Sequence, residues 1–388
     1  MRAPESYRGR EQTWAKHLFL ERYLERVARN ILSFRDEFVY VDGFSGPWQS
    51  KDEELKDTSF AIALDQLRKV RDDYGKIGKS RRIRCLFNDG DAEAHERLQH
   101  YLAAIDDIET KAVCRNFEDL VPEIVAYVGD AFSLTFIDPT GWTDFALQKI
   151  QDLLRLPGEV IVNLMFDYVN RFVGDPRPEI LSTFDPLFGG PDWYEEILSR
   201  IHEGQSREDA IVGIYCERLR RFGHFRHVTS TRILKPLTDR VYFHLVYGTG
   251  HTKGLIEFRM VEEKAVDDQE QVRDIAKIVH REHRSGQTEL FAEPGDQVSP
   301  SQAEAERRKR LAQAHAQLRE LLSTRKVVEY DEVLGVLLEI PMVWRSDINA
   351  WLGDLRASGE IDIRNLGARA RVPQFGKGHV IVWRGQQS

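Results

Sequence analysis

The first half of the chain alternates between short apolar runs and amphipathic segments. Residues 38–41, Phe-Val-Tyr-Val, end at Asp42-Gly43 and predict a buried strand. Similar runs predict strands at 83–87, 111–114 (weaker), 133–137 and 160–164. An opening helix is predicted at 14–33, and further helices between the strands at 59–72, 92–105, 119–128 and 145–154. This alternation predicts a parallel sheet with helices on both faces.

The remainder of the chain divides at a stretch of turn-forming residues. Residues 165–225 predict a helical insertion after the fifth strand, and strands follow at 227–234 and 241–247. Residues 285–303 have the composition of a linker, so we expect one domain at 1–284 and a second at 304–388. In the second, helices are predicted at 304–322, 330–338 and 345–357, and strands at 360–364 and 379–384. Three helices followed by a two-stranded ribbon is the element order of a winged helix.

Composition narrows the class of protein. The chain has 388 residues, 41% hydrophobic and 30% charged, enough apolar surface for two or three globular domains. No stretch has the apolar length of a membrane helix, and residues 1–12 lack an apolar signal core, so we expect a cytoplasmic protein without a membrane partner. The three cysteines are far apart in sequence, which predicts neither a zinc motif nor a disulfide framework. The net charge of −8 excludes a uniformly basic nucleic-acid coat.

Polar and glycine residues follow four successive apolar runs. The strand ends carry Asp42-Gly43-Phe44-Ser45-Gly46-Pro47, then Asn88-Asp89, then Asn116-Phe117, and then Asp138-Pro139. Because ligands of open α/β sheets bind at the carboxyl ends of the strands, we expect these residues to line one cleft.

The kinds of residue at these ends indicate a nucleoside ligand. Glycines allow the backbone to approach a ligand, but G-x-G-x-x-G is absent, which argues against a dinucleotide. Asp-x-Phe-Ser-Gly instead resembles the first motif of class I S-adenosylmethionine methyltransferases. The resemblance implies that Asp42 and residues 43–47 hold the methionine portion, Asp89 the ribose, and Asn116 with Phe117 the adenine. Asp138 would orient or deprotonate the methyl acceptor, with the Pro139 carbonyl as a second hydrogen-bond acceptor.

The chain also resembles a more specific family, the three-Cys-motif partner proteins, which have a Rossmann-type, methyltransferase-like fold. The residues that carry the resemblance are Lys16 with Tyr23-Leu24, residues 42–47, 87–91, 136–141 and 161–165, Asn170-Arg171, and residues 245–254. The resemblance implies S-adenosylmethionine as cofactor and a partner protein, similar to radical enzymes, that carries clustered cysteines. The expected fold is α/β, a class I methyltransferase-like Rossmann sheet with a helical insertion and a small C-terminal winged-helix domain.

The sequence leaves the methyl acceptor and two other classes of function open. In amino-methylating DNA enzymes an Asp or Asn, two prolines and an aromatic residue hold the target amino group. Here Thr140-Gly141 interrupts that pattern and Trp142 comes one place late. One alternative is a metal-dependent nuclease or hydrolase in which Asp42, Asp89 and Asp138 collect magnesium. The other is a non-catalytic regulator that senses a nucleotide or binds nucleic acid.

The predicted C-terminal domain carries the candidate nucleic-acid contacts. Residues 301–388 contain 14 Lys and Arg against 11 Asp and Glu, a small basic excess in an acidic chain. The candidate contacts on the third helix and the wing are Arg345, Asn349, Arg356, Arg369, Arg371 and Lys377. A winged helix used for protein docking or dimerisation is the alternative.

Overall fold

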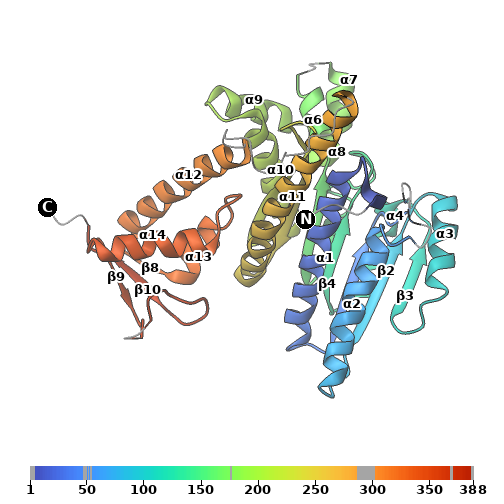
Figure 1. Cartoon of the computed structure of the whole chain (residues 1–388), viewed down its shortest axis with the longest axis horizontal. Helices are drawn as coiled ribbons and strands as arrows, with labels where there is room; N and C mark the ends of the chain where they lie inside the picture. The colour runs from blue at the N-terminus through green and yellow to red at the C-terminus, as the bar shows by residue number, and fades with distance from the viewer. Residues whose placement is uncertain are drawn as a thin grey trace. The chain divides into compact units, whose positions relative to one another are not determined.

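The computed structural model describes residues 5–46, 50, 52, 55–174, 177–285, 302–367 and 370–385 (Figure 1). The chain forms two compact units, Met1–Gly250 with Ala265–Pro294, and His251–Lys264 with Gly295–Ser388. Residues 286–301, most of the predicted linker, lie outside the described residues, so the division at 285–303 stays a prediction.

The first unit is built on a seven-stranded sheet of order β3-β2-β1-β4-β5-β7-β6. Its strands are β1 (Glu37–Asp42), β2 (Arg82–Asn88), β3 (Glu109–Val113), β4 (Phe132–Ile137), β5 (Gly158–Leu164), β6 (His227–Leu234) and β7 (Val241–Thr249). Strands β1 to β5 pair in parallel, and β7 runs antiparallel to both β5 and β6. This order, with one reversed strand beside β5, is that of the class I methyltransferase-like Rossmann fold, which confirms the predicted fold class.

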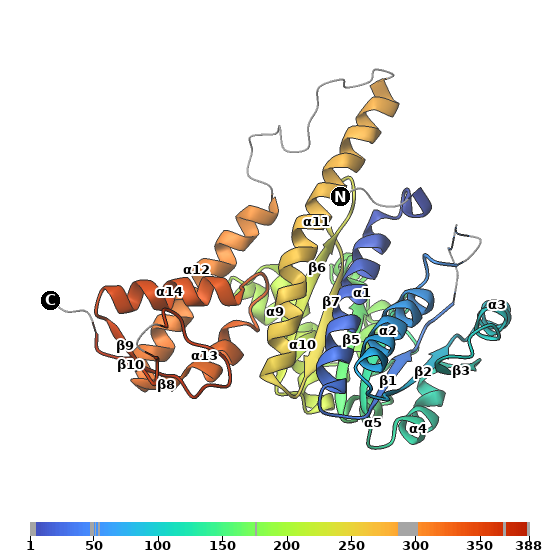
Figure 2. The ribbon, with the colours of Figure 1, turned by 60° about the horizontal axis from the view of Figure 1, so that its bottom comes forward.

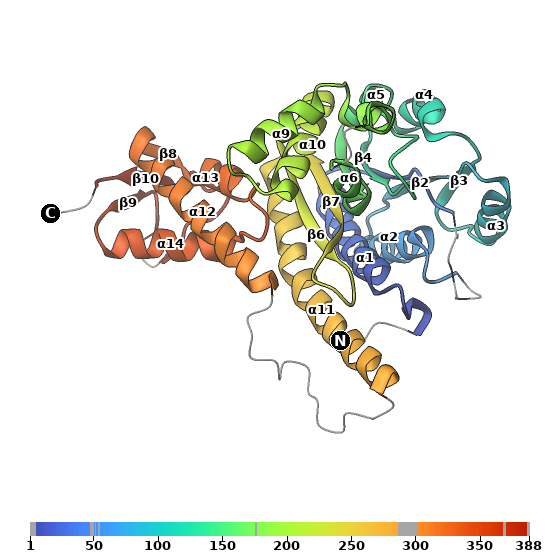
Figure 3. The same ribbon diagram turned by 90° about the horizontal axis from the view of Figure 1, so that it is seen from above.

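Helices cover both faces of this sheet, as Figure 2 and Figure 3 show. One face carries α1 (Glu11–Leu32) and α2 (Ser59–Lys76), and the other carries α4 (Phe117–Val128), α5 (Gln151–Leu154) and α10 (Arg207–Gly223). Helix α3 (Ala92–Leu102) packs beside the edge strand β3. The alternation along β1 explains the two faces, because Val39 and Val41 enter the core beneath α4 while Tyr40 packs edge-on against Phe87 on the other side.

The structure differs from the prediction at two helices. Of the helix predicted at 145–154, only 151–154 is helical. The preceding residues run as turns because the Ala146 N–H donates to Glu118 (2.8 Å) and the Leu147 N–H to the Pro186 carbonyl (3.1 Å). The 34-residue helix α11 (Thr252–Ser285) was not among the predicted elements.

The predicted helical insertion is confirmed. It contains α6 (Phe166–Phe172), α7 (Pro178–Leu181), α8 (Asp185–Phe188) and α9 (Trp193–His202), followed by α10. Its helices belong to the same apolar core as the sheet, because Phe184, Phe188 and Trp193 cluster with Tyr215 of α10.

The second unit combines three helices with a three-stranded antiparallel sheet of order β8-β10-β9. The elements are α12 (Gln302–Arg325), β8 (Val327–Glu329), α13 (Tyr330–Leu337), α14 (Arg345–Ala357), β9 (Ile361–Arg364) and β10 (Val380–Trp383). The bounds of α14 agree with the prediction, whereas β8 was missed because it has only three residues.

The first turns of α11 also pack in this unit, through a buried ion pair. The Arg259 guanidinium contacts Glu262 (2.7 Å) and donates to the Leu338 carbonyl (2.7 Å), and Glu262 accepts from the Met342 N–H (3.2 Å). Arg259 is 1% exposed and Glu262 is fully buried. A pair of this kind holds the segment in one geometry because either charge alone would be costly to bury.

Candidate functional site

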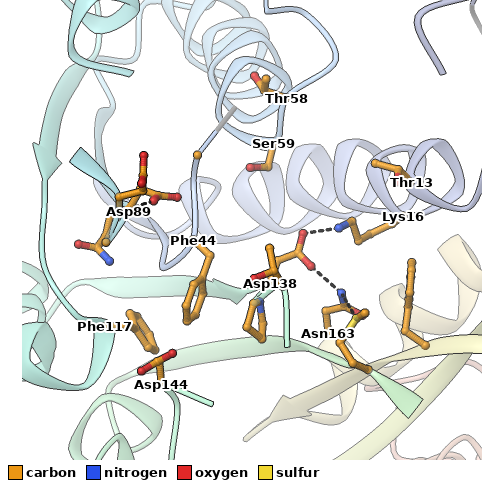
Figure 4. Close-up of a pocket in the computed structure, with 18 of the residues that line it drawn as sticks. Thr13, Lys16, Phe44, Thr58, Ser59, Asp89, Phe117, Asp138, Asp144 and Asn163 are labelled. Atoms are coloured by element: carbon orange, nitrogen blue, oxygen red, sulfur yellow. Dashed lines mark hydrogen bonds and ion pairs between the residues drawn. The ribbon is translucent and has the colours of Figure 1, made fainter. Parts of the chain in front are cut away.

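A cleft of about 670 Å³ opens at the carboxyl ends of the parallel strands (Figure 4). Of the residues predicted to form a site, those that line it are Phe44, Gly46, Asp89, Asn116, Phe117, Asp138 and Pro139. Asp42, Gly43 and Ser45 are not among the lining residues, and Pro47 lies outside the described residues. Strand ends that are far apart in sequence therefore meet at one site.

Asp42, which is buried and does not line the cleft, forms hydrogen bonds that hold the loop after β1 in place. This carboxylate is fully buried and accepts from the Phe44 N–H (3.2 Å), while the Ser45 hydroxyl donates to the Asp42 carbonyl (3.0 Å). Burial raises the pKa of Asp42 to about 7, against the opposing effect of hydrogen bonds from Ser59 and Phe44. Asp42 thus acts on the cleft by shaping the loop.

Gly43 allows this loop to pack closely on Phe117. A Cβ at position 43 would lie 2.6 Å from a carbon of the Phe117 ring, which is closer than real side chains approach. The Phe44 ring also packs on Phe117, with centroids 5.2 Å apart. Glycine at this position is therefore required by the packing of the aromatic wall.

Asn88, at the end of β2, forms hydrogen bonds to the loops that follow β1 and β3. Its Nδ2 donates to the carbonyls of Gly43 (3.0 Å) and Arg115 (3.1 Å), and its Oδ1 accepts from the Arg115 N–H (3.2 Å). The next residue, Asp89, is 2% exposed, lines the cleft and accepts from the Asp91 N–H (2.8 Å). A carboxylate is thus held at the cleft wall by a preformed turn.

Both polar groups of the Asn116 side chain form hydrogen bonds within the protein. Its Oδ1 accepts from the Glu118 N–H (3.0 Å) as the N-cap of α4, and its Nδ2 donates to Asp144 (2.9 Å). Asp144 also lines the cleft and has a left-handed backbone, with φ of 71°. Asn116, which was predicted to contact a ligand, is therefore hydrogen-bonded to Asp144, a carboxylate that the sequence analysis did not identify.

The opposite end of the cleft holds a three-residue cluster at Asp138. Lys16 Nζ of α1 contacts one carboxylate oxygen of Asp138, and Asn163 Nδ2 at the end of β5 donates to the other (2.6 Å). Lys16 is 9% exposed and Asn163 2% exposed, and all three residues line the cleft. Figure 4 shows Phe44 between this cluster and Asp89.

The position of Lys16 is fixed by the packing of α1. Tyr23 lies two helical turns after Lys16, and its hydroxyl donates to Glu159 of β5 (2.7 Å) and contacts the Tyr247 hydroxyl of β7 (2.7 Å). Tyr23 is fully buried. This anchor sets the register of α1 against the sheet and so places the Lys16 ammonium at Asp138.

Aromatic side chains line the cleft beside this cluster. Tyr168 of α6 and Tyr242 and Phe243 of β7 belong to the lining, and Lys16 Nζ lies 5.6 Å from the Phe243 ring centroid. On the α1 side, His17 is buried and bonded to the Tyr7 hydroxyl (2.9 Å). Burial, followed by the charge of Lys16, lowers the pKa of His17 well below its usual value. His17 is therefore neutral at physiological pH.

Trp142 does not reach the cleft. Its ring packs against Tyr168 (centroids 5.5 Å apart), Phe172 (5.9 Å) and Phe184 (5.1 Å), in the apolar core of the insertion. Trp142 is absent from the residues that line the cleft, whereas Thr140 is present.

The candidate nucleic-acid residues of the second unit fall into two groups. The Tyr330 hydroxyl accepts from Arg345 Nε (3.2 Å) and donates to Asn349 Oδ1 (2.7 Å), so both side chains have partners inside the unit. The exposed residues of the set are Arg356, Arg371 and Lys377, and Arg369 lies outside the described residues. The loop between β9 and β10 is closed by a hydrogen bond from Asn365 Nδ2 to the Gly378 carbonyl (2.8 Å).

Among residues 5–46, 50, 52, 55–174, 177–285, 302–367 and 370–385, no group of three His, Cys, Asp or Glu side chains is arranged to hold a metal ion. In those same ranges, none of the helices combines the length and the apolar character that crossing a bilayer requires.

The sequence pattern did not reveal several polar residues of the cleft, among them Lys16, Asn163 and Asp144. Lys16 and Asn163 were noted only as part of the family resemblance, because a single lysine on a helix or an asparagine inside an apolar strand has no spacing signal. Asn163 could have been found as the one amide in the apolar run 160–164, since a buried strand rarely includes an amide without a partner for it.

The chain matches no family model and no curated protein. Among solved structures, protein LPL1258 of Legionella pneumophila str. Philadelphia 1, described as DUF519, aligns with a TM-score of 0.38 and 13% identity, over 67% of this chain and 93% of its own. A loganic acid methyltransferase with SAH aligns with a TM-score of 0.29 and 10% identity, over 75% of this chain and 95% of its own. Similarity this low identifies no function, so the fold class rests on the strand order and pairing described above.

Proposed function

We propose that the chain is an S-adenosylmethionine-dependent methyltransferase. The observation that carries the proposal is the cleft itself, with buried Asp89 at one end and Asp138, bonded to Lys16 and Asn163, at the other. Ligands of open α/β sheets occupy this edge, and a carboxylate at the end of the second strand is placed to bind ribose hydroxyls.

The residues present fit such a cofactor. Asp89 is held by the Asp91 N–H in a position to accept from the ribose, and Gly43 leaves room for Phe117 at the wall. Asn116 is hydrogen-bonded to Asp144, and we expect this carboxylate to serve as the acceptor for the exocyclic amine of adenine. When bound, S-adenosylmethionine supplies a sulfonium-activated methyl group, and the protein contributes orientation and charge.

The methyl acceptor we propose is nucleic acid. The element order α12-β8-α13-α14-β9-β10 supports a winged helix in the second unit, and exposed Arg356, Arg371 and Lys377 offer contacts to phosphate. Because Arg345 and Asn349 are bonded to Tyr330, phosphate contact has more support than base reading by α14.

A titration with S-adenosylhomocysteine tests the proposed cofactor. We expect the full chain to bind it with one site, and Asp89→Asn to weaken binding about 10- to 150-fold by removing a charge-assisted hydrogen bond. Asparagine retains an oxygen for the Asp91 N–H, so the turn should survive. Asp152→Asn is the matched control, because Asp152 is exposed on α5 and does not line the cleft. Equal affinities for all three proteins would remove Asp89 from the site, and no binding would refute the proposed function.

A further inference from the structure

At the Asp138 end of the cleft, one polar atom lacks a hydrogen-bond partner among the described residues. Lys16 can only donate hydrogen bonds, and its ammonium faces one oxygen of Asp138 while Asn163 Nδ2 faces the other. Asn163 Oδ1, by contrast, is buried and has no hydrogen-bond partner among the described residues. The cluster therefore contains a charged donor, Lys16 Nζ, and a buried acceptor without a partner, Asn163 Oδ1.

The Lys16 ammonium, which has donors beyond the one directed at Asp138, and the unpartnered Asn163 Oδ1 together favour a group that can both accept and donate hydrogen bonds. A hydroxyl oxygen can accept from the Lys16 ammonium while its hydrogen points to Asn163 or Asp138. The amino group of a base is a poor match, because it would place N–H donors against an ammonium. The aromatic residue that would stack on a flipped base is also lacking at the expected place, since Trp142 is packed into the insertion.

The aromatic lining indicates what carries the hydroxyl. Tyr168 and Tyr242, which are partly exposed, line the same cleft, and aromatic faces of this kind stack on nucleobases with little regard to sequence. In RNA the ribose 2′-hydroxyl is both donor and acceptor, whereas DNA lacks it.

We propose that the acceptor is a ribose 2′-hydroxyl of RNA, held by Lys16 and Asn163 beside Asp138. The inference rests on the proposed use of S-adenosylmethionine. The acceptor oxygen forms a bond to the methyl carbon as the carbon–sulfur bond breaks, and the bonding electrons leave with sulfur as a neutral thioether. The hydroxyl becomes acidic as the new bond forms, and its proton passes to the carboxylate of Asp138. The Lys16 ammonium stabilises negative charge that develops on the oxygen.

The test follows transfer of tritium from methyl-labelled S-adenosylmethionine by the full chain. The probes are total RNA from a bacterium that lacks this chain, and heat-denatured DNA as the matched substrate without 2′-hydroxyls. Labelled RNA is then hydrolysed in alkali, because a 2′-O-methyl group blocks cleavage at its own phosphodiester and leaves the label in a dinucleotide. We expect label in RNA but not in DNA, recovered in alkali-resistant dinucleotides.

Variants test the role of Lys16. Lys16→Met should lower transfer about 100-fold while the affinity for S-adenosylhomocysteine, which carries no sulfonium charge, stays within about twofold. Lys16→Arg should recover part of the transfer, and Lys69→Met, an exposed lysine of α2 outside the cleft, should leave it unchanged. These results would support a direct contact between Lys16 and the acceptor.

Three outcomes would overturn the proposal while leaving the proposed use of S-adenosylmethionine intact. They are label in base-methylated mononucleotides, no label in RNA from protein that binds S-adenosylhomocysteine, and full transfer by Lys16→Met. Failure to bind S-adenosylhomocysteine would instead refute the proposed function, so the two failures are distinguishable.

Discussion

Asp42 should make the stability of the first unit fall as pH rises, and Asp42→Asn should remove that dependence. The carboxylate is fully buried behind the cleft, and burial raises its pKa from 3.8 to about 7. A shift of about 3 pKa units at about 1.4 kcal/mol per unit corresponds to about 4 kcal/mol between the protonated and the ionised protein. This contribution is fully present below pH 4, where Asp42 is protonated in both states, and is lost as pH rises through 7.

Asparagine resembles the protonated carboxyl group in shape and does not ionise. We therefore expect the free energy of unfolding of Asp42→Asn, relative to the natural protein, to increase by about 4 kcal/mol between pH 4 and pH 8. Urea denaturation at matched pH values measures this difference, in which groups that titrate independently of Asp42 cancel. A difference that stays constant across that range, or that falls with pH, would show that Asp42 is not a buried acid with a raised pKa.

Two further substitutions test the packing that shapes each unit. Gly43→Ala should destabilise the protein by about 1–3 kcal/mol and weaken binding of S-adenosylhomocysteine, because the new methyl group would meet the Phe117 ring at 2.6 Å; unchanged thermal unfolding and titration would contradict this. Glu262→Ala should lower the free energy of unfolding by about 3–5 kcal/mol, because it leaves the Arg259 guanidinium buried without its carboxylate partner. Glu320→Ala, at an exposed residue, should have little effect in the same thermal or urea unfolding measurement. Equal effects of the two substitutions would contradict the role of the buried pair.

The sequence allowed the sheet and its binding edge to be predicted because both depend on local patterns. Buried parallel strands have continuous apolar runs, and the residue after each run must lie at the carboxyl edge. That logic identified Asp89 and Asp138, which both line the cleft. It could not reveal Lys16, whose place at Asp138 depends on how Tyr23 seats α1 across β5 and β7.

The sequence also could not show which predicted site residues form hydrogen bonds to other side chains of the protein. Asn116 lies at the cleft as predicted, but its amide is bound by Asp144, which approaches from a turn after β4 with a left-handed backbone. Arg345 and Asn349 lie on the predicted helix α14 but are bonded to Tyr330 of α13. Tertiary contacts decide which polar groups face a ligand. The hydrophobic period of a helix or strand contains no information about these contacts.

The most direct test of the central claim is a crystal structure of the full chain with S-adenosylhomocysteine. We predict that the nucleoside lies in the cleft with its ribose hydroxyls about 2.6–3.2 Å from the Asp89 carboxylate, and with the sulfur directed toward Asp138 and Lys16. A nucleoside bound elsewhere, or bound in the cleft with Asp89 out of reach of the ribose, would contradict the account.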